Sequence, residues 1–160
     1  MLIREAISSD EEAIWAIMQP IIAAGETYTF SPQSTKEQLL AFWCAGDKHV
    51  FVAEKDGKLL GTFFIKANQA TLGAHIANAG FMTHPEATGQ GIGWAMGKRA
   101  LIEAKQLGFH AMQFNFVVKS NQVALRLWQK LGFEIIGEIP DAFQHPRLGL
   151  TNAYIMYQKL

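Results

Sequence analysis

The chain has 160 residues, of which 49% are hydrophobic and 18% charged, and its formal net charge is zero with neutral histidines. This composition excludes a disordered chain and argues against a general nucleic-acid-binding protein, and no apolar run reaches the length of a membrane span. The single cysteine, Cys44, excludes an internal disulfide and a multi-cysteine metal site. Acidic residues stand where a signal peptide would be basic and then apolar. We therefore expect one cytoplasmic domain over residues 1–160, with no metal and no membrane or nucleic-acid partner.

Hydrophobic periodicity and turn residues predict the elements of the first part of the chain. The expected elements are a strand at Leu2–Ala6, a helix that begins near Ser9 and ends at Gly25, a helix that opens at Thr35, and strands at His49–Glu54 and Leu59–Lys66. The dipeptide Asp56-Gly57 between the last two strands is a strong hairpin signal.

The rest of the chain alternates strands and helices, and the hydrophobic period becomes helical at the glycine-rich stretch near residue 91. The expected elements are a strand at Ala70–Thr83, a helix from Gly91 to Leu107, a strand at Ala111–Val118, a helix that opens at Ser120 or Asn121 and ends at Gly132, strands at Phe133–Ile139 and Ala153–Gln158, and an irregular loop at Pro140–Asn152. This order indicates an α+β fold with one parallel crossover through the glycine-led helix.

The segment Thr83–Leu101, THPEATGQGIGWAMGKRAL, places three alternate glycines at the expected start of a helix. Free amide groups and the helix dipole make such a start an anion site, and glycines let a phosphate approach the backbone. A Walker A loop is excluded because Ile92 stands where its first glycine is needed, and a dinucleotide fingerprint because Trp94 or Met96 stands at its third. Six basic residues and one acid lie between residues 88 and 130, which fits either solvated helix faces or a local anion site.

Two motifs in this region resemble those of the GNAT superfamily of acyl-CoA-dependent N-acetyltransferases. The run Thr88-Gly89-Gln90-Gly91-Ile92-Gly93 is similar to the family's pyrophosphate loop, commonly R/Q-x-x-G-x-G/A. The segment Asn121–Phe133, NQVALRLWQKLGF, is similar to N-x-x-A-x-x-L-Y-x-K-x-G-F. The resemblance spans nearly the whole chain and implies the α+β GNAT fold, a mixed and mostly antiparallel central sheet of about seven strands flanked by about four helices and splayed between strands 4 and 5.

The resemblance implies acetyl-CoA as co-substrate, held by the backbone of the glycine loop and of the preceding strand. The residues that it implies for acetyl-CoA binding are Phe81, Met82, Thr83, Thr88, Gly89, Gln90, Gly91, Ile92, Gly93, Trp94, Asn115, Asn121, Trp128 and Lys130. Thr88 replaces the usual Arg or Gln, and Trp128 replaces the tyrosine that protonates the departing thiolate in many members. Because an indole donates a hydrogen bond but releases no proton, the thiolate would leave more slowly or unaided. A backbone amide near Met82 or Thr83 would polarise the thioester carbonyl.

The stretches NAGFMTHP, FNFVVKSN and AFQHPRLGLTNAYIMYQ resemble phosphinothricin-type and fungal proline-analogue acetyltransferases. That likeness implies a catalytic Asn78 at the reacting amine and places Asn115 close to the acetyl group or the pantetheine. The simpler alternatives are a strand-edge or bulge residue for Asn78 and a hydrogen-bonded amide in a buried strand for Asn115. Glu26, in the loop GETYTF, would bind an ammonium group or relay a proton. The expected acceptor contacts are Tyr28, Phe30 and His75. Packing beneath the loop is the alternative for the two aromatic residues, and a surface position for the histidine.

The sequence thus predicts an acetyl-CoA-dependent N-acetyltransferase that acts on a small amine, an amino acid or an amino-acid-like antimetabolite, by direct attack in a ternary complex. A detoxifying role would follow from such an acceptor, and the family resemblance suggests a homodimer. Two alternatives stay open. One is a catalytically weak acyl-CoA-binding sensor, which Thr88 and Trp128 favour, and the other is an acetyltransferase that acts on a protein amine.

Overall fold

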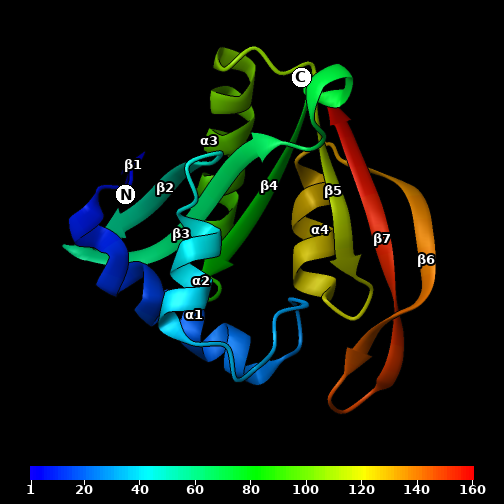
Figure 1. Cartoon of the computed structure of the whole chain (residues 1–160), viewed down its shortest axis with the longest axis horizontal. Coiled ribbons are helices and arrows are strands. Elements are labelled where there is room, and N and C mark those ends of the chain that lie inside the picture. Colours follow the sequence, from blue (N-terminus) through cyan, green and yellow to red (C-terminus); the bar gives the residue numbers. More distant parts are fainter.

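The computed structural model describes residues 1–160 and contains one seven-stranded sheet in the order β1-β2-β3-β4-β5-β7-β6 (Figure 1). Strands β4 and β5 are parallel, and all other neighbours are antiparallel. The strands are β1 (Leu2–Glu5), β2 (His49–Lys55), β3 (Lys58–Ala67), β4 (Ile76–Thr83), β5 (Ala111–Val118), β6 (Glu134–His145) and β7 (Gly149–Lys159). The helices are α1 (Glu11–Ala24), α2 (Lys36–Trp43), α3 (Ile92–Gln106) and α4 (Gln122–Lys130), with short 3-10 turns η1 (Ser8–Asp10), η2 (Thr71–Gly73) and η3 (Pro85–Ala87). The expected α+β class and the parallel crossover are confirmed.

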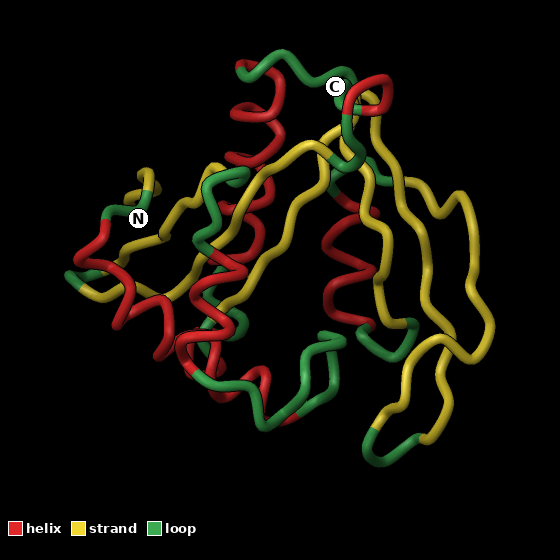
Figure 2. The backbone as a smooth tube through the Cα atoms, in the orientation of Figure 1, coloured by secondary structure: helices red, strands yellow, loops and turns green.

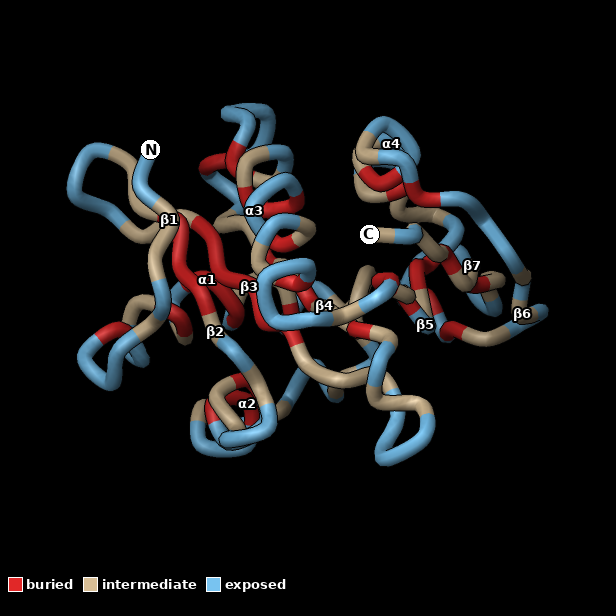
Figure 3. The backbone as a smooth tube through the Cα atoms, turned by 90° about the horizontal axis from the view of Figure 1, so that it is seen from above, coloured by how far each residue is buried: buried red, intermediate tan, exposed pale blue.

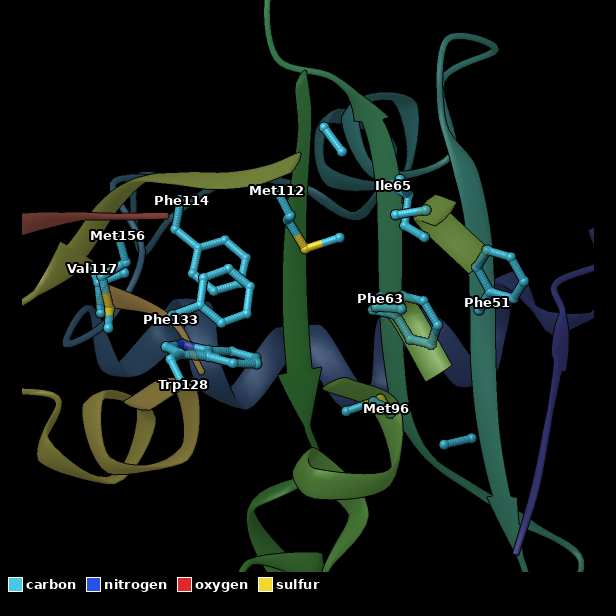
Figure 4. Close-up of a cluster of buried hydrophobic side chains, with 14 of the residues drawn as sticks. Phe51, Phe63, Ile65, Met96, Met112, Phe114, Val117, Trp128, Phe133 and Met156 are labelled. Atoms are coloured by element: carbon cyan, nitrogen blue, oxygen red, sulfur yellow. The ribbon is translucent and has the colours of Figure 1, made fainter. Parts of the chain in front are cut away.

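The two faces of the sheet carry separate hydrophobic clusters because side chains alternate along each strand. Phe51 and Phe63 face α3 and α4 and share a cluster with Met96 of α3 (Figure 4). Val52 and Phe64 point to the other face, where they pack against α1 and α2. Figure 3 shows the buried residues concentrated on β2, β3 and the inner sides of the helices. None of the helices combines the length and the hydropathy needed to cross a bilayer.

The residues that signal a helix cap and a hairpin turn adopt the structures that their types predict. Thr35 caps α2 by accepting a hydrogen bond from the amide of Gln38, whose side chain accepts one in return from the amide of Thr35. Asp56 and Gly57 join β2 to β3 with φ values of +53° and +75°, the two consecutive left-handed residues of a tight hairpin turn.

The strand predicted at Ala70–Thr83 is shorter than expected and begins at Ile76. The residues before it form η2, in which Thr71 has a positive φ of +47° and Leu72 is 95% exposed. Pairing between β3 and β4 accordingly extends only to Ala67 opposite Ala77.

The irregular loop predicted at Pro140–Asn152 is wrong, because these residues extend the β6–β7 hairpin to a turn at residues 146–148. Pro140, which has no amide to donate, lies in a bulge between Ile139 and Phe143. Asp141 in this bulge has a φ of +49° and donates its amide to the Asn152 side chain at 2.9 Å. Because Pro140 lies in the bulge, where no ladder hydrogen bond needs its amide, the strand continues beyond it (Figure 2).

An ion pair fixes the start of the chain against the first helix. The guanidinium of Arg4 donates to both carboxylate oxygens of Asp10, at 2.7 and 2.9 Å, and the amide of Ile7 donates to the same carboxylate at 2.8 Å. The side chain of Asp10 is 8% exposed. The hydrogen bonds from Arg4 hold the pKa of Asp10 below its ordinary value.

Replacing Asp10 with Asn is expected to lower the free energy of unfolding at pH 7 by about 2 kcal/mol, because the charged partner of Arg4 is lost. A carboxylate whose pKa is lower in the folded chain stabilises the fold above its unfolded pKa of about 3.9 and loses this effect as the pH falls through its folded pKa. Urea denaturation at pH 7 and pH 3 should therefore show a smaller difference between wild type and variant at pH 3. Glu138→Gln, which breaks an exposed ion pair with Lys119, is the control and should cost under about 1 kcal/mol. Equal losses from Asp10→Asn at both pH values would contradict the role of the carboxylate charge.

Candidate functional site

The glycine loop ends at the start of α3 with its backbone open to solvent. Gly89 and Gly91 both have φ values of +80°, and a Cβ added to either would meet no atom within 4 Å. The first helical hydrogen bond of α3 runs from the amide of Ala95 to the carbonyl of Gly91. The amides of the first helical residues, Ile92, Gly93 and Trp94, therefore lack helical acceptors and lie at the positive end of the dipole. This geometry suits an anion.

A lysine that the sequence reasoning missed lies beside this loop. Lys55, at the end of β2, donates to the side chain of Gln90 at 3.1 Å, and Gln90 in turn donates to the carbonyl of Glu86. A positive charge is therefore present near the loop, although Thr88 contributes none. Only the hairpin register brings Lys55 here, from 35 residues away in the sequence.

The parallel strands β4 and β5 separate soon after they meet. Their pairing consists of Ile76 with Ala111 and Ala77 with Met112. Immediately beyond, the Asn78 side chain donates to the carbonyl of Gln113 at 2.9 Å and so bridges the diverging backbones. Figure 1 shows the two strands diverging from this point, which is the expected splay between strands 4 and 5.

A cavity of about 620 Å³ lies at this splay and joins most of the predicted site residues. Its lining includes the predicted residues Glu26, Tyr28, Phe30, Asn78, Phe81, Met82, Thr83, Thr88, Asn115, Asn121 and Trp128. Lining residues that the sequence reasoning did not single out include Thr27, Thr29, Phe42, Phe64 and Phe116. A volume of this size is typical of small-molecule sites.

The remaining predicted residues lie outside the lining of this cavity. They are Gly89, Gln90, Gly91, Ile92, Gly93 and Trp94 of the adjoining glycine loop, together with His75 and Lys130. Lys130 is exposed in the last turn of α4, at the opposite end of that helix from Asn121. His75 is exposed just before β4 and packs edge-on against His110 at 5.8 Å. The acceptor contact expected of His75 therefore has no support in the structure.

A polar network holds Asn115 at the cavity wall. Pairing of β5 with β7 shifts between Phe114 and Val117, so that Asn115 lies in a bulge. Its side-chain oxygen accepts from Gln113 at 2.9 Å, and its amide donates to Asn68 at 2.6 Å. A bulge of this kind redirects side chains, which explains why an exposed asparagine interrupts the buried pattern of β5.

The start of α4 contributes a cap and an aromatic wall. Asn121 accepts a hydrogen bond from the amide of Ala124 at 3.2 Å, which leaves its side-chain amide available to the cavity. Two turns after Asn121, Trp128 is 7% exposed and packs on Phe81 and Phe114, each with ring centroids 4.7 Å away. Figure 4 shows Trp128 beside Phe114 and Phe133 in this cluster. Trp128 therefore packs in the aromatic wall between the two halves of the sheet.

The loop between α1 and α2 forms the opposite wall and is tied to the tip of the β6–β7 hairpin. Glu26 pairs with Arg147 at 2.8 Å. The buried His145 orders the hairpin turn, because its Nδ1 accepts the amides of Arg147 and Leu148, each at 3.2 Å. The structure contains no group of three or more His, Cys, Asp or Glu residues arranged to hold a metal ion.

Comparison with known proteins identifies the class to which this fold and cavity belong. The sequence pattern of the Acetyltransferase (GNAT) family matches residues 15–133, and the chain belongs to this family. The resemblance inferred from the glycine loop and from Asn121–Phe133 is thereby confirmed.

Individual relatives agree with this assignment. A GCN5-related N-acetyltransferase from Kribbella flavida has a TM-score of 0.94 and 39% sequence identity, covering 99% of this chain and 97% of that one. The N-acetyltransferase aca1 of Schizosaccharomyces pombe is 38% identical over 98 residues, which are 61% of this chain and 47% of that protein. The matched region thus spans about half the length of the yeast relative. A phosphinothricin acetyltransferase from Sinorhizobium meliloti, solved in complex with acetyl-CoA, has the same fold, with a TM-score of 0.87 at 20% identity over 99% of this chain and 88% of that one.

Replacing Gly91 with Ala is expected to lower the free energy of unfolding by about 1 kcal/mol, because an L-residue is strained at its positive φ. Gly46→Ala is the matched control, since its added Cβ also meets no atom within 4 Å and its φ lies outside the left-handed region. Urea denaturation measures both changes. If the two variants were equally stable, the loop conformation at Gly91 would not depend on glycine.

Proposed function

We propose that the protein is an acetyl-CoA-dependent N-acetyltransferase that acetylates the amine of a small molecule, an amino acid or an amino-acid-like antimetabolite. Membership of the GNAT family supports the reaction type. The relatives from Schizosaccharomyces pombe and Kribbella flavida are N-acetyltransferases, and the structural neighbour from Sinorhizobium meliloti is a phosphinothricin acetyltransferase in complex with acetyl-CoA, which supports N-acetyl transfer. A cytoplasmic location, a homodimer and a detoxifying role stay predictions from the sequence.

The observation that carries this proposal is that a single cavity reaches from Thr88, beside the glycine loop, to Glu26 in the loop between α1 and α2. Donor and acceptor must meet for direct attack in a ternary complex. The splay of β4 and β5 supplies a common space for them between the two helix layers. One end of this space is suited to phosphates and the other carries a carboxylate.

The residues near the glycine loop fit the chemistry of a CoA pyrophosphate. Three helix-start amides lack acceptors, no atom crowds Gly89 or Gly91, and Lys55 adds a positive charge. The gap-facing backbone of β4 and the amide of Asn121 would hold the pantetheine arm, which carries amide groups of its own. Acetyl-CoA supplies a thioester. Transfer from it forms a C–N bond to the neutral amine and breaks the C–S bond, so that sulfur leaves as the thiolate and nitrogen loses one proton to solvent. The thiolate becomes a thiol only when it takes a proton back from solvent.

The protein's own groups would then position the acceptor and receive its proton. Asn78, fixed by its bond to Gln113, has a side-chain oxygen that would accept a hydrogen bond from the reacting amine. Glu26 would bind the ammonium form and pass its proton on through water. An α-amino group has a pKa near 8, so a useful fraction is neutral at pH 7 without a strong base.

The size and walls of the cavity support a compact acceptor. Phe30, Phe42 and Phe64 form an apolar surface, and Glu26 is the one acidic residue in the lining, which contains no Lys, Arg or His. The Glu26–Arg147 pair at the rim offers one negative and one positive group, which together match the ammonium and carboxylate of an amino acid.

Acetyl-CoA binding is tested by thermal denaturation. A ligand present at about 100 times its Kd and bound only to the folded state should raise the Tm by about 5–10 °C. ATP, which carries phosphates but no pantetheine, is the control and should give a much smaller shift. Turnover is then measured by thiol release with proline analogues, phosphinothricin, methionine sulfoximine, polyamines and a peptide with a free N-terminus. Absence of a shift with acetyl-CoA would refute the proposal. Tight binding without turnover would favour the sensor, and turnover of the peptide alone would favour a protein acceptor.

Asn78→Ala is expected to lower kcat/KM for the acceptor about 100-fold, because the reacting amine loses a positioning group, while the Kd for acetyl-CoA changes less than about 3-fold. Asn152→Ala, which removes an amide side chain that binds Asp141 outside the cavity, is the matched control and should leave both quantities nearly unchanged. Parallel loss of acceptor turnover and acetyl-CoA affinity in Asn78→Ala would contradict its proposed role. Steady-state kinetics and calorimetric titration separate the two outcomes.

A further inference from the structure

The hydroxyl of Tyr28 binds both backbone groups of one residue on β4. It accepts a hydrogen bond from the amide of Phe81 at 2.9 Å and donates one to the carbonyl of Phe81 at 2.7 Å. Tyr28 belongs to the loop between α1 and α2, 53 residues away in the sequence. Figure 1 shows this loop, in blue, reaching toward the open end of the gap between β4 and β5. The contact therefore connects the acceptor wall of the cavity to the strand edge.

The bonded groups of Phe81 face the gap. In an antiparallel ladder, successive residues direct their amide and carbonyl to opposite sides of the strand. His84, just after β4, donates its amide to the carbonyl of Leu60 on β3. By this alternation, the amide and carbonyl of Met82 also face β3, whereas those of Phe81 and Thr83 face the gap. The amide expected near Met82 or Thr83 for the thioester is therefore that of Phe81 or Thr83. Of these two amides, that of Phe81 already donates a hydrogen bond to the hydroxyl of Tyr28.

The phenol is rigidly mounted. Its ring stacks on Phe30, with centroids 5.9 Å apart, and meets the edge of Trp43 at 6.3 Å. Trp43 is fully buried and is itself fixed by a hydrogen bond from its indole to Thr62 at 3.0 Å. Burial raises the pKa of Tyr28 well above its ordinary value, against the opposing effect of the hydrogen bond from Phe81. The hydroxyl thus stays protonated and remains a donor throughout the physiological pH range.

We propose that the hydroxyl of Tyr28 and the amide of Phe81 together form a two-donor site for the acetyl carbonyl oxygen of acetyl-CoA. The inference rests on the proposed function. In the free protein, the Phe81 amide donates to the phenol oxygen, and the phenol donates its proton to the Phe81 carbonyl. When the substrate carbonyl enters, its oxygen becomes a second acceptor for the Phe81 amide, and the phenol turns its proton from the Phe81 carbonyl to that same oxygen while its ring stays in place.

Tyr28 would in this way contribute an O–H group to a reaction centre in which Trp128 contributes none. Donors fixed in advance toward an oxygen that gains negative charge stabilise the transition state more than the ground state. A neutral phenol with a raised pKa suits this task, since it keeps its proton and so remains a hydrogen-bond donor. Tyr28 is then a catalytic residue and not only part of the acceptor wall.

The test replaces Tyr28 with Phe, which keeps the ring that packs on Phe30 and Trp43 and removes only the hydroxyl. We expect kcat to fall about 100-fold while KM for acetyl-CoA changes less than about 3-fold, because one transition-state donor is lost. Tyr157→Phe, which removes a phenol hydroxyl outside the cavity, is the matched control and should change kcat less than about 2-fold. Thermal denaturation of both variants verifies that they are folded.

A spectroscopic readout separates this role from a structural one. The infrared carbonyl band of acetyl-CoA labelled with ¹³C at the acetyl carbonyl is recorded on the protein without acceptor. Loss of a donor should shift the band to higher wavenumber in Tyr28→Phe than in wild type, and Tyr157→Phe should leave it unchanged. An unmoved band in Tyr28→Phe would overturn the inference whatever happens to kcat, since the hydroxyl would then only close the strand edge. Failure of wild type to bind acetyl-CoA would overturn the proposed function as well, whereas binding with an unmoved band overturns the role of Tyr28 alone.

Discussion

The separation of β4 from β5 is the constraint on which the site depends. A strand inside a sheet must satisfy its amides and carbonyls, and an unpaired edge in a protein interior is costly. After Ala77, β4 has no strand partner on one side. The chain compensates with side chains, since Asn78 bridges to Gln113 and Tyr28 binds Phe81. The backbone groups of Ala79 and Thr83 are left facing the gap, where a ligand with amide groups could complete the ladder. The cavity is therefore a direct consequence of interrupted strand pairing.

Close packing of α3 on α4 brings two helix starts to this gap. A Cβ on Gly97 would lie 2.5 Å from a methyl carbon of Leu131, and one on Gly93 would lie 3.2 Å from a methyl carbon of Leu127, so the lack of side chains at these glycines leaves room for the leucines of α4. Thr88 before α3 and Asn121 before α4 consequently line the same cavity. Gly89 and Gly91 serve a different purpose, because their surroundings are open and only their backbone conformation requires glycine. One glycine-rich stretch thus combines a loop conformation with a helix contact.

Features governed by neighbouring residues were predictable from the sequence, whereas those governed by register were not. The cap at Thr35 and the hairpin turn at Asp56-Gly57 have local causes, and the glycine loop with the segment after Asn121 indicated the family. The bulge at Pro140 depends on pairing with β7, which no local pattern reveals. The contact of Lys55 with Gln90 and that of Arg147 with Glu26 likewise join distant segments. A charge or hydroxyl brought in by the fold leaves no spacing signal in the sequence.

The two helix layers have different roles at the site, as Trp128 shows: one layer supplies aromatic packing and the other supplies a hydroxyl group. On the α3 and α4 face, Trp128 joins Phe81 and Phe114 in an aromatic cluster that holds the two halves of the sheet together where strand pairing has stopped. A residue committed to that packing has no acidic proton to offer. The α1 and α2 face supplies the hydroxyl instead, through Tyr28, and delivers it to the backbone of the same Phe81 whose ring packs on Trp128. Phe81 thus takes part in both: its ring packs on Trp128 across the splay, and its backbone binds the hydroxyl that would serve the reaction.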